Sequence, residues 1–172
     1  MKKIAIVGPG GAGKTHLASR LGQLLGIQVF HLDAYLFKPG WRIITLSDQK
    51  KIVAEMVSRP AWIVDGEHLP TQILRFSHAD AIVFLDVPLM TRLQQLWRRS
   101  RLEDRARADV ASGCDADFSL FALKWALLYP ILHRGKTLRN LDRFIRTKQV
   151  YVLHKRNEVD QFVQQIAGQL NA

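Results

Sequence analysis

The sequence predicts an α/β fold with three layers, in which helices cover both faces of a five-stranded parallel sheet. Two observations lead to this prediction. Short apolar runs, most of them ending at a glycine or an aspartate, are typical of buried parallel strands. Segments with apolar residues at helical spacing, such as Leu17, Leu21 and Leu24, alternate with these runs and provide the crossovers. The predicted strands are residues 4–7, 27–32, 62–64, 81–85 and 150–153.

The length and composition favour a single domain over residues 1–172. Hydrophobic residues make up 48% of the chain and charged residues 23%, which excludes an intrinsically disordered protein. Cys114 is the single cysteine and cannot form an internal disulfide, so we expect a cytoplasmic protein. The longest apolar stretch, residues 120–132, contains Lys124 and is too short to cross a bilayer, so we expect no membrane association.

Positive charge is concentrated in the second half of the chain. The net charge is +10, and residues 89–156 hold 15 Lys or Arg against 6 Asp or Glu. The rest of the chain is nearly balanced, with 10 against 9. A local excess of this kind predicts an anionic partner, either the phosphates of a small ligand or a nucleic-acid backbone.

The strongest motif lies between the first predicted strand and the first predicted helix. Residues 8–15 read GPGGAGKT and satisfy G-x-x-x-x-G-K-[ST] at every fixed position, which indicates a phosphate-binding P-loop. The alternative is a glycine-rich turn with an incidental Lys-Thr pair. The P-loop interpretation predicts bound ATP and Mg²⁺, with Lys14 reaching the β and γ phosphates and the Thr15 hydroxyl binding the metal. The expected nucleotide contacts are Gly8, Gly10, Gly11, Ala12, Gly13, Lys14, Thr15 and His16.

Three aspartates, Asp33, Asp65 and Asp86, follow apolar strands, and ligands of open α/β sheets lie beyond the carboxyl ends of strands. Asp65 ends the third strand as a Walker B acid does, so we interpret it as a Mg²⁺ ligand, with a turn-forming role as the alternative. Asp33 is either a catalytic base that orients an acceptor hydroxyl or a loop cap. Asp86 comes shortly before Pro88 and a helix, which favours a cap.

An arginine-rich polar segment over about residues 98–117 is a candidate lid. Five arginines fall within ten positions, and their planar forks match phosphate oxygens. A lid closing over ATP would exclude water from the transfer reaction. The alternative is a solvated helical face with Glu103 and Asp104 as local partners.

Taken together, these motifs resemble the adenylate-kinase-like superfamily of P-loop phosphotransferases, and most closely the bacterial DNA topology modulation proteins. The resemblance implies a nucleoside-monophosphate-kinase-like P-loop fold whose third strand lies beside the P-loop strand, which favours Asp65 over Asp86 at the metal. It also implies that residues 98–117 form the lid and that Arg105 and Arg107 are its catalytic phosphate contacts. The motifs that carry it are GPGGAGKT, HLDAYLFKPGW, WIVDGEH, ADAIVFLDVP, RARADVASGCDADF and FALKW.

The expected function is a kinase that transfers the γ-phosphoryl group of ATP-Mg to a small hydroxyl-bearing or nucleotide acceptor. Adenylate kinases carry D-G-F-P-R after the third strand, whereas this chain has Asp65-Gly66-Glu67-His68. It also has no arginine near Asp33. Both differences weaken the case for a nucleotide as the acceptor. The alternative is a nucleotide-dependent, nucleic-acid-binding regulator with weak or no kinase activity. Nucleic acid ranks second because no known reading module appears in the sequence.

Overall fold

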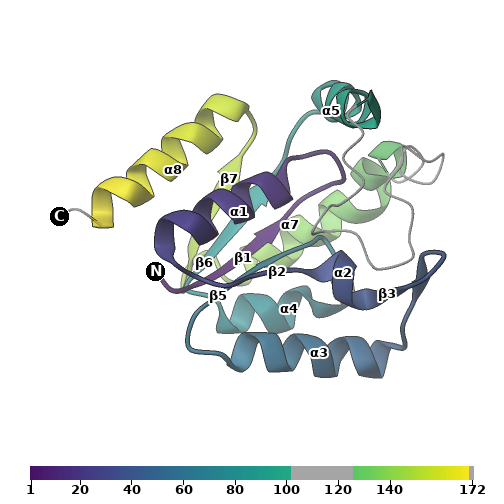
Figure 1. The fold of residues 1–172 in the computed structure, drawn as a ribbon, viewed down its shortest axis with the longest axis horizontal. Coiled ribbons are helices and arrows are strands. Elements are labelled where there is room, and N and C mark those ends of the chain that lie inside the picture. The colour runs from purple at the N-terminus through teal and green to yellow at the C-terminus, as the bar shows by residue number, and fades with distance from the viewer. Residues whose placement is uncertain (102–125, 171–172) are drawn as a thin grey trace.

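The computed structural model describes residues 1–101 and 126–170 and contains the predicted five-stranded parallel sheet (Figure 1). The strand order is β2-β5-β1-β6-β7, so the third sheet strand of the chain, β5, lies beside β1 as expected. Ile6 of β1 is level with Asp65 of β5, and His31 of β2 is level with Asp65 on its other side. The strands are β1 (Lys3–Val7), β2 (Val29–His31), β5 (Trp62–Asp65), β6 (Ala81–Leu85) and β7 (Gln149–Leu153).

Helices cover both faces of the sheet, which confirms the three-layer prediction (Figure 1). Side chains alternate along each strand, so Ala5 and Val7 of β1 face one core while Ile4 and Ile6 face the other. The first core is closed by α3 (Leu46–Ser58), α4 (Leu69–His78) and α7 (Gly135–Asp142). The second is closed by α1 (Lys14–Leu25) and α8 (Arg156–Leu170).

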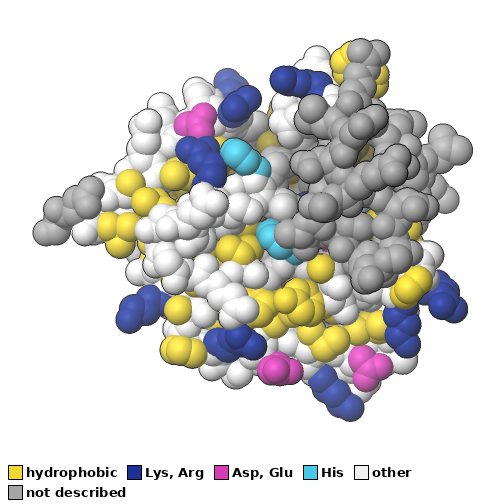
Figure 2. Space-filling model, viewed as in Figure 1, with side chains coloured by type: hydrophobic (Ala, Val, Ile, Leu, Met, Phe, Trp, Pro, Cys, Tyr) yellow, Lys and Arg dark blue, Asp and Glu magenta, His cyan; other side chains and the backbone are white. Residues whose placement is uncertain are grey.

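The segment between β2 and α3 contains a short helix and a hairpin. Asp33 lies in the first turn of α2 (Leu32–Leu36), and the following residues form a hairpin of β3 (Phe37–Lys38) and β4 (Arg42–Ile43). Trp41 has a φ of 57°, which is rare for a residue with a side chain. Tyr35, Ile43 and Leu46 expose about half of their side chains here, and Figure 2 shows hydrophobic side chains gathered where α2 and α3 lie.

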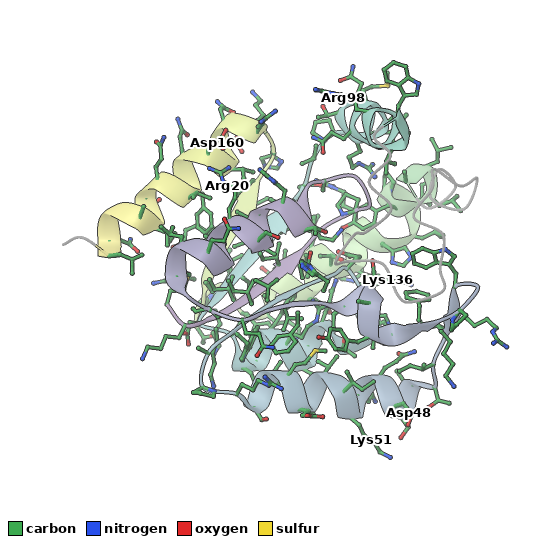
Figure 3. The ribbon with its side chains drawn as sticks, in the orientation of Figure 1. Arg20, Asp48, Lys51, Arg98, Lys136 and Asp160 are labelled. Carbon is green, nitrogen blue, oxygen red and sulfur yellow. The ribbon has the colours of Figure 1, made fainter. Side chains whose placement is uncertain are left out.

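Two side-chain contacts stabilise the helices of these layers. Thr45 caps α3, because its hydroxyl accepts a hydrogen bond from the Asp48 amide at 3.2 Å. Arg20 of α1 points toward Asp160 of α8, with a 2.5 Å hydrogen bond between them (Figure 3). This ion pair joins the two helices of the second core.

The helix after residue 125 contains a π turn, η1 (Pro130–Arg134), that leads directly into α7. Pro130 has no amide hydrogen, so the regular helical bonding changes at this point. The candidate lid begins within α5 (Leu89–Arg101), and its later part, including Arg105 and Arg107, lies outside the described residues. Within residues 1–101 and 126–170, no helix is long and apolar enough to pass through a bilayer.

Candidate functional site

The glycines of the P-loop have conformations and neighbours that exclude side chains. Gly8 and Gly11 have φ values of 143° and 77°, in the region that favours glycine. A Cβ at Gly8 would lie 2.6 Å from the Leu85 carbonyl oxygen, and one at Gly11 would lie 2.9 Å from the Arg92 carbonyl oxygen. A Cβ at Gly10 would meet nothing within 4 Å, so the loop is packed on one side and open on the other.

Helix α1 begins at Lys14, immediately after the loop, and no side chain caps it. Its first turn contains no acidic residue, so no carboxylate of the helix itself competes for the positive end of its dipole. Lys14 Nζ donates to the Pro9 carbonyl at 3.0 Å, which keeps the ammonium folded over the loop. Ala12 is buried in the core, so its contribution to a ligand would come from its main chain, whereas His16 is exposed. These features fit a bound polyphosphate.

Asp65 lies at the carboxyl edge of the sheet, one strand away from the P-loop. Its side chain is buried, and its Oδ1 is 2.8 Å from Nδ1 of His31 on the neighbouring strand β2. The expected role of Asp65 as a Mg²⁺ ligand stays a prediction. His31 already contacts Oδ1, one of the two carboxylate oxygens. His31 was missing from the predicted site because its pairing with Asp65 follows from the strand order.

A fully buried arginine, Arg75 of α4, lies among the acidic residues. Its guanidinium donates to the main-chain carbonyls of Gly66 at 2.8 Å, Glu67 at 3.2 Å and His68 at 3.3 Å. Burial lowers the pKa of Arg75 to about 10, while the nearby carboxylates of Glu67, Asp65 and Asp33 raise it. Arg75 is therefore a cation at neutral pH, and Asp33 belongs to the same charged cluster as Asp65.

Glu67 was noted in the sequence only as a departure from the adenylate-kinase motif, yet it contacts the P-loop directly. Its Oε2 accepts the Gly8 amide hydrogen at 2.8 Å. Its Oε1 accepts from Thr137 at 2.5 Å, from Gln72 at 3.1 Å and from Tyr129 at 3.3 Å. Burial, followed by the Glu67 charge, raises the pKa of Tyr129, so the phenol keeps the proton that it donates.

The third aspartate, Asp86, follows β6 and forms an ion pair. The Nε and Nη2 atoms of Arg134 donate to its two carboxylate oxygens at 2.9 and 2.7 Å, and this pairing raises the pKa of Arg134. His154, after β7, lies 3.8 Å from the same carboxylate. Arg134 is therefore an arginine held at the carboxyl edge of the sheet, although the predicted lid did not include it.

The remaining polar groups of the site provide neither a second cation at His68 nor a metal site made of protein side chains alone in the described residues. Burial and the neighbouring Arg75 lower the pKa of His68 to about 4, so this imidazole is neutral at pH 7. In the described part of the chain, no group of three His, Cys, Asp or Glu side chains could hold a metal by itself. Mg²⁺ commonly binds through one or two protein oxygens with phosphates and water, which Thr15 and one carboxylate would allow.

Comparisons with known proteins bear on the fold. No protein-family model matches the chain, and no curated protein matches it in sequence. Among solved structures, a deoxyadenosine kinase from M. mycoides matches with a TM-score of 0.55 at 14% identity, over 98% of each chain. A shikimate kinase from Acinetobacter baumannii matches with a TM-score of 0.56 at 19% identity, over 98% of this chain and 94% of that chain. A shikimate kinase from Bacteroides thetaiotaomicron matches with a TM-score of 0.53 at 15% identity, over 99% of each chain. The protein therefore has the fold of the P-loop kinases.

Proposed function

We propose that the protein is a kinase that transfers the γ-phosphoryl group of ATP-Mg to a small neutral hydroxyl compound. One observation carries this proposal: a phosphate loop with an uncapped helix and a folded-over lysine lies beside a cluster of carboxylates at the same edge of the sheet. The loop would bind the triphosphate of the phosphoryl donor, and a carboxylate in the cluster can receive the proton of an acceptor hydroxyl. The names of the structural neighbours, which are all kinases, agree with it.

The proposed roles follow the order of the reaction. Loop amides and Lys14 hold the triphosphate, and Thr15 with Asp65 would hold Mg²⁺, which neutralises charge on the β and γ phosphates. Asp33 accepts the proton as the acceptor oxygen bonds to the γ phosphorus. The bond from that phosphorus to the bridging oxygen breaks, and ADP leaves. Arg105 and Arg107 are proposed to contact the transferred group.

The charge of the cluster favours an acceptor without an acidic group. The negative charges of Glu67, Asp65 and Asp33 all act on Arg75, whose donors already bind three main-chain carbonyls. His68 is neutral at pH 7 and supplies no second cation. In the described residues of this cluster, negative charge therefore exceeds positive charge, which disfavours a phosphate or carboxylate on the acceptor. A nucleotide acceptor is correspondingly less favoured than a nucleoside, a sugar or a polyol.

A screen with labelled ATP across nucleosides, sugars, polyols and nucleoside monophosphates tests the reaction and its acceptor class. With the best acceptor, Asp33→Asn should lower kcat by about 100-fold or more, because the proton acceptor is lost while the side-chain size is kept. The Kd for ATP-Mg should stay within about 3-fold, since Asp33 has no role at the loop. Asp48→Asn, at an exposed position of α3, is the matched control and should leave kcat unchanged. Turnover equal to wild type in Asp33→Asn would rule out its catalytic role.

A second candidate is a nucleotide-dependent nucleic-acid-binding regulator, in keeping with the resemblance to DNA topology modulation proteins. It is favoured by exposed cations at spacings of three to four residues along α7 and the turn after it. These are Lys136, Arg139, Arg143 and Arg146, and Lys136 is labelled in Figure 3. Lys136 and Arg139, three positions apart, share one side of α7, and with Arg143 and Arg146 in the turn after it they could follow a phosphate backbone.

Replacing these four residues with glutamine should weaken duplex DNA binding and reduce the slope of log affinity against log salt by up to about 4. Fluorescence anisotropy between 50 and 200 mM salt, with and without ATP, would measure both quantities. The matched control replaces Arg42, Lys50, Lys51 and Arg59, which are also exposed, with glutamine. Equal weakening in both quadruple variants would indicate general electrostatics and no binding surface on α7.

A further inference from the structure

We propose that Glu67 is a positioning residue of the P-loop, whose carboxylate fixes the first amide of the loop and thereby the shape that binds phosphate. This proposal rests on the proposed function in that the ligand of the loop is a polyphosphate. The contact that carries it is the 2.8 Å hydrogen bond from the Gly8 amide to Glu67 Oε2. Gly8 lies 59 positions earlier in the chain, so the bond joins two separate segments at the carboxyl edge of the sheet.

Gly8 is the point at which the direction of the loop is set. Its φ of 143° follows directly after β1, and its Cα is packed so closely against Leu85 that a Cβ would overlap the Leu85 carbonyl. The backbone conformation of Gly8 therefore determines the direction in which the following amides of the loop point. An acceptor that holds the Gly8 amide therefore limits the conformations of the loop before any ligand binds.

The Glu67 carboxylate is itself held from several sides. Thr137 and Tyr129 donate to Oε1 from the helical segment around η1 and α7, and Gln72 donates from α4. Gln72 also donates to the Glu67 carbonyl at 2.8 Å and accepts from Asn140 at 2.9 Å, so its orientation is fixed. A carboxylate with this many donors keeps its position, which is what a positioning residue needs.

The charge of Glu67 makes the proposal distinguishable from a simple electrostatic effect. A negative charge beside a phosphate site weakens anion binding, so its removal alone would strengthen it. A positioning role predicts the opposite, because the loop loses its preferred shape. A third possibility, an indirect contact with Mg²⁺, predicts an effect that requires the metal.

Calorimetry with three probes separates these cases: ATP with EDTA, ATP-Mg and inorganic tripolyphosphate. Glu67→Ala should raise the Kd of all three by a similar factor of about 10-fold or more, the value expected for a lost charge-assisted hydrogen bond. Glu67→Gln should stay within about 3-fold of wild type, because the amide oxygen can still accept from Gly8 while its NH₂ group faces the hydroxyls of Thr137 and Tyr129, which can accept. The Gln72 amide would lose its bond to Oε1 but keep its bonds to the Glu67 carbonyl and to Thr137. Glu55→Ala, at an exposed glutamate of α3, is the control and should change nothing.

Unchanged or tighter binding in Glu67→Ala overturns the proposal, as does a loss seen only with Mg²⁺. Hydrogen exchange of the Gly8 amide in the unliganded protein gives a second readout that needs no nucleotide. Glu67→Ala should speed that exchange by about 10-fold or more, and Glu67→Gln should preserve the wild-type rate. If the wild-type protein bound none of the three probes, the proposed function would fail, while the Gly8 exchange rate would still decide whether Glu67 holds the loop.

Discussion

Replacing Lys14 with alanine is expected to raise the Kd for ATP-Mg by roughly 100-fold or more. Lys14 supplies the ammonium group of the P-loop motif, and its Nζ lies over the loop, bound to the Pro9 carbonyl at 3.0 Å. On binding, the ammonium would exchange this neutral acceptor for phosphate oxygens. A charge-assisted hydrogen bond to a phosphate contributes about 3 kcal/mol, which corresponds to the expected loss.

Isothermal titration calorimetry measures this loss directly, and thermal unfolding provides an independent check. A ligand that binds only the folded state raises the unfolding temperature, so the shift caused by saturating ATP-Mg in wild type should nearly vanish in Lys14→Ala. Without nucleotide, both proteins should unfold within about 1 kcal/mol of each other, since Lys14 is only half-buried and its ammonium donates to a carbonyl of its own loop. Lys51→Ala, on the exposed side of α3, is the control. Wild-type affinity in Lys14→Ala would contradict the assignment of the loop.

Most of the fold could be predicted from local patterns in the sequence. The runs around Ala5, Ile63 and Ile82 are short and apolar throughout, which only a strand buried on both faces explains well. The P-loop could be predicted because its spacing is fixed by the phosphates and not by the rest of the protein. The position of β5 beside β1 came from the resemblance, since apolar runs alone do not determine the order of strands.

The contacts that build the site could not be predicted in the same way, because they join distant parts of the chain. Glu67 binds Gly8 and Thr137, which lie 59 and 70 positions away. His31 meets Asp65 only because β2 and β5 are neighbours in register. The sequence did contain a signal in α4, where the buried positions include Thr71, Gln72 and Arg75. Polar residues on the inner side of a helix indicate partners inside the protein, but they do not identify them.

Arg75 has the largest expected effect on stability among these inner residues. Arg75→Met should lower the free energy of unfolding by about 3–5 kcal/mol, the usual cost of removing one partner from a buried charged group. Two losses contribute to it. The carbonyls of Gly66, Glu67 and His68 would lose their donors. The carboxylates of Glu67, Asp65 and Asp33, whose charges raise the pKa of Arg75, would also lose the attraction of this cation.

Urea unfolding of Arg75→Met at pH 8 and pH 5 tests both the size and the origin of this effect. The deficit relative to wild type should be present at both pH values, because the main-chain carbonyls that lose their donors do not titrate. Arg75→Lys, which keeps the charge but loses the planar fork, should be destabilised by less.

Arg59→Met is the control for an exposed arginine, and it should change stability by about 1 kcal/mol or less although the Arg59 guanidinium lies over Phe30. If Arg75→Met were as stable as the Arg59 variant at pH 8, the hydrogen bonds of the Arg75 guanidinium could not be what stabilises the segment from Gly66 to His68.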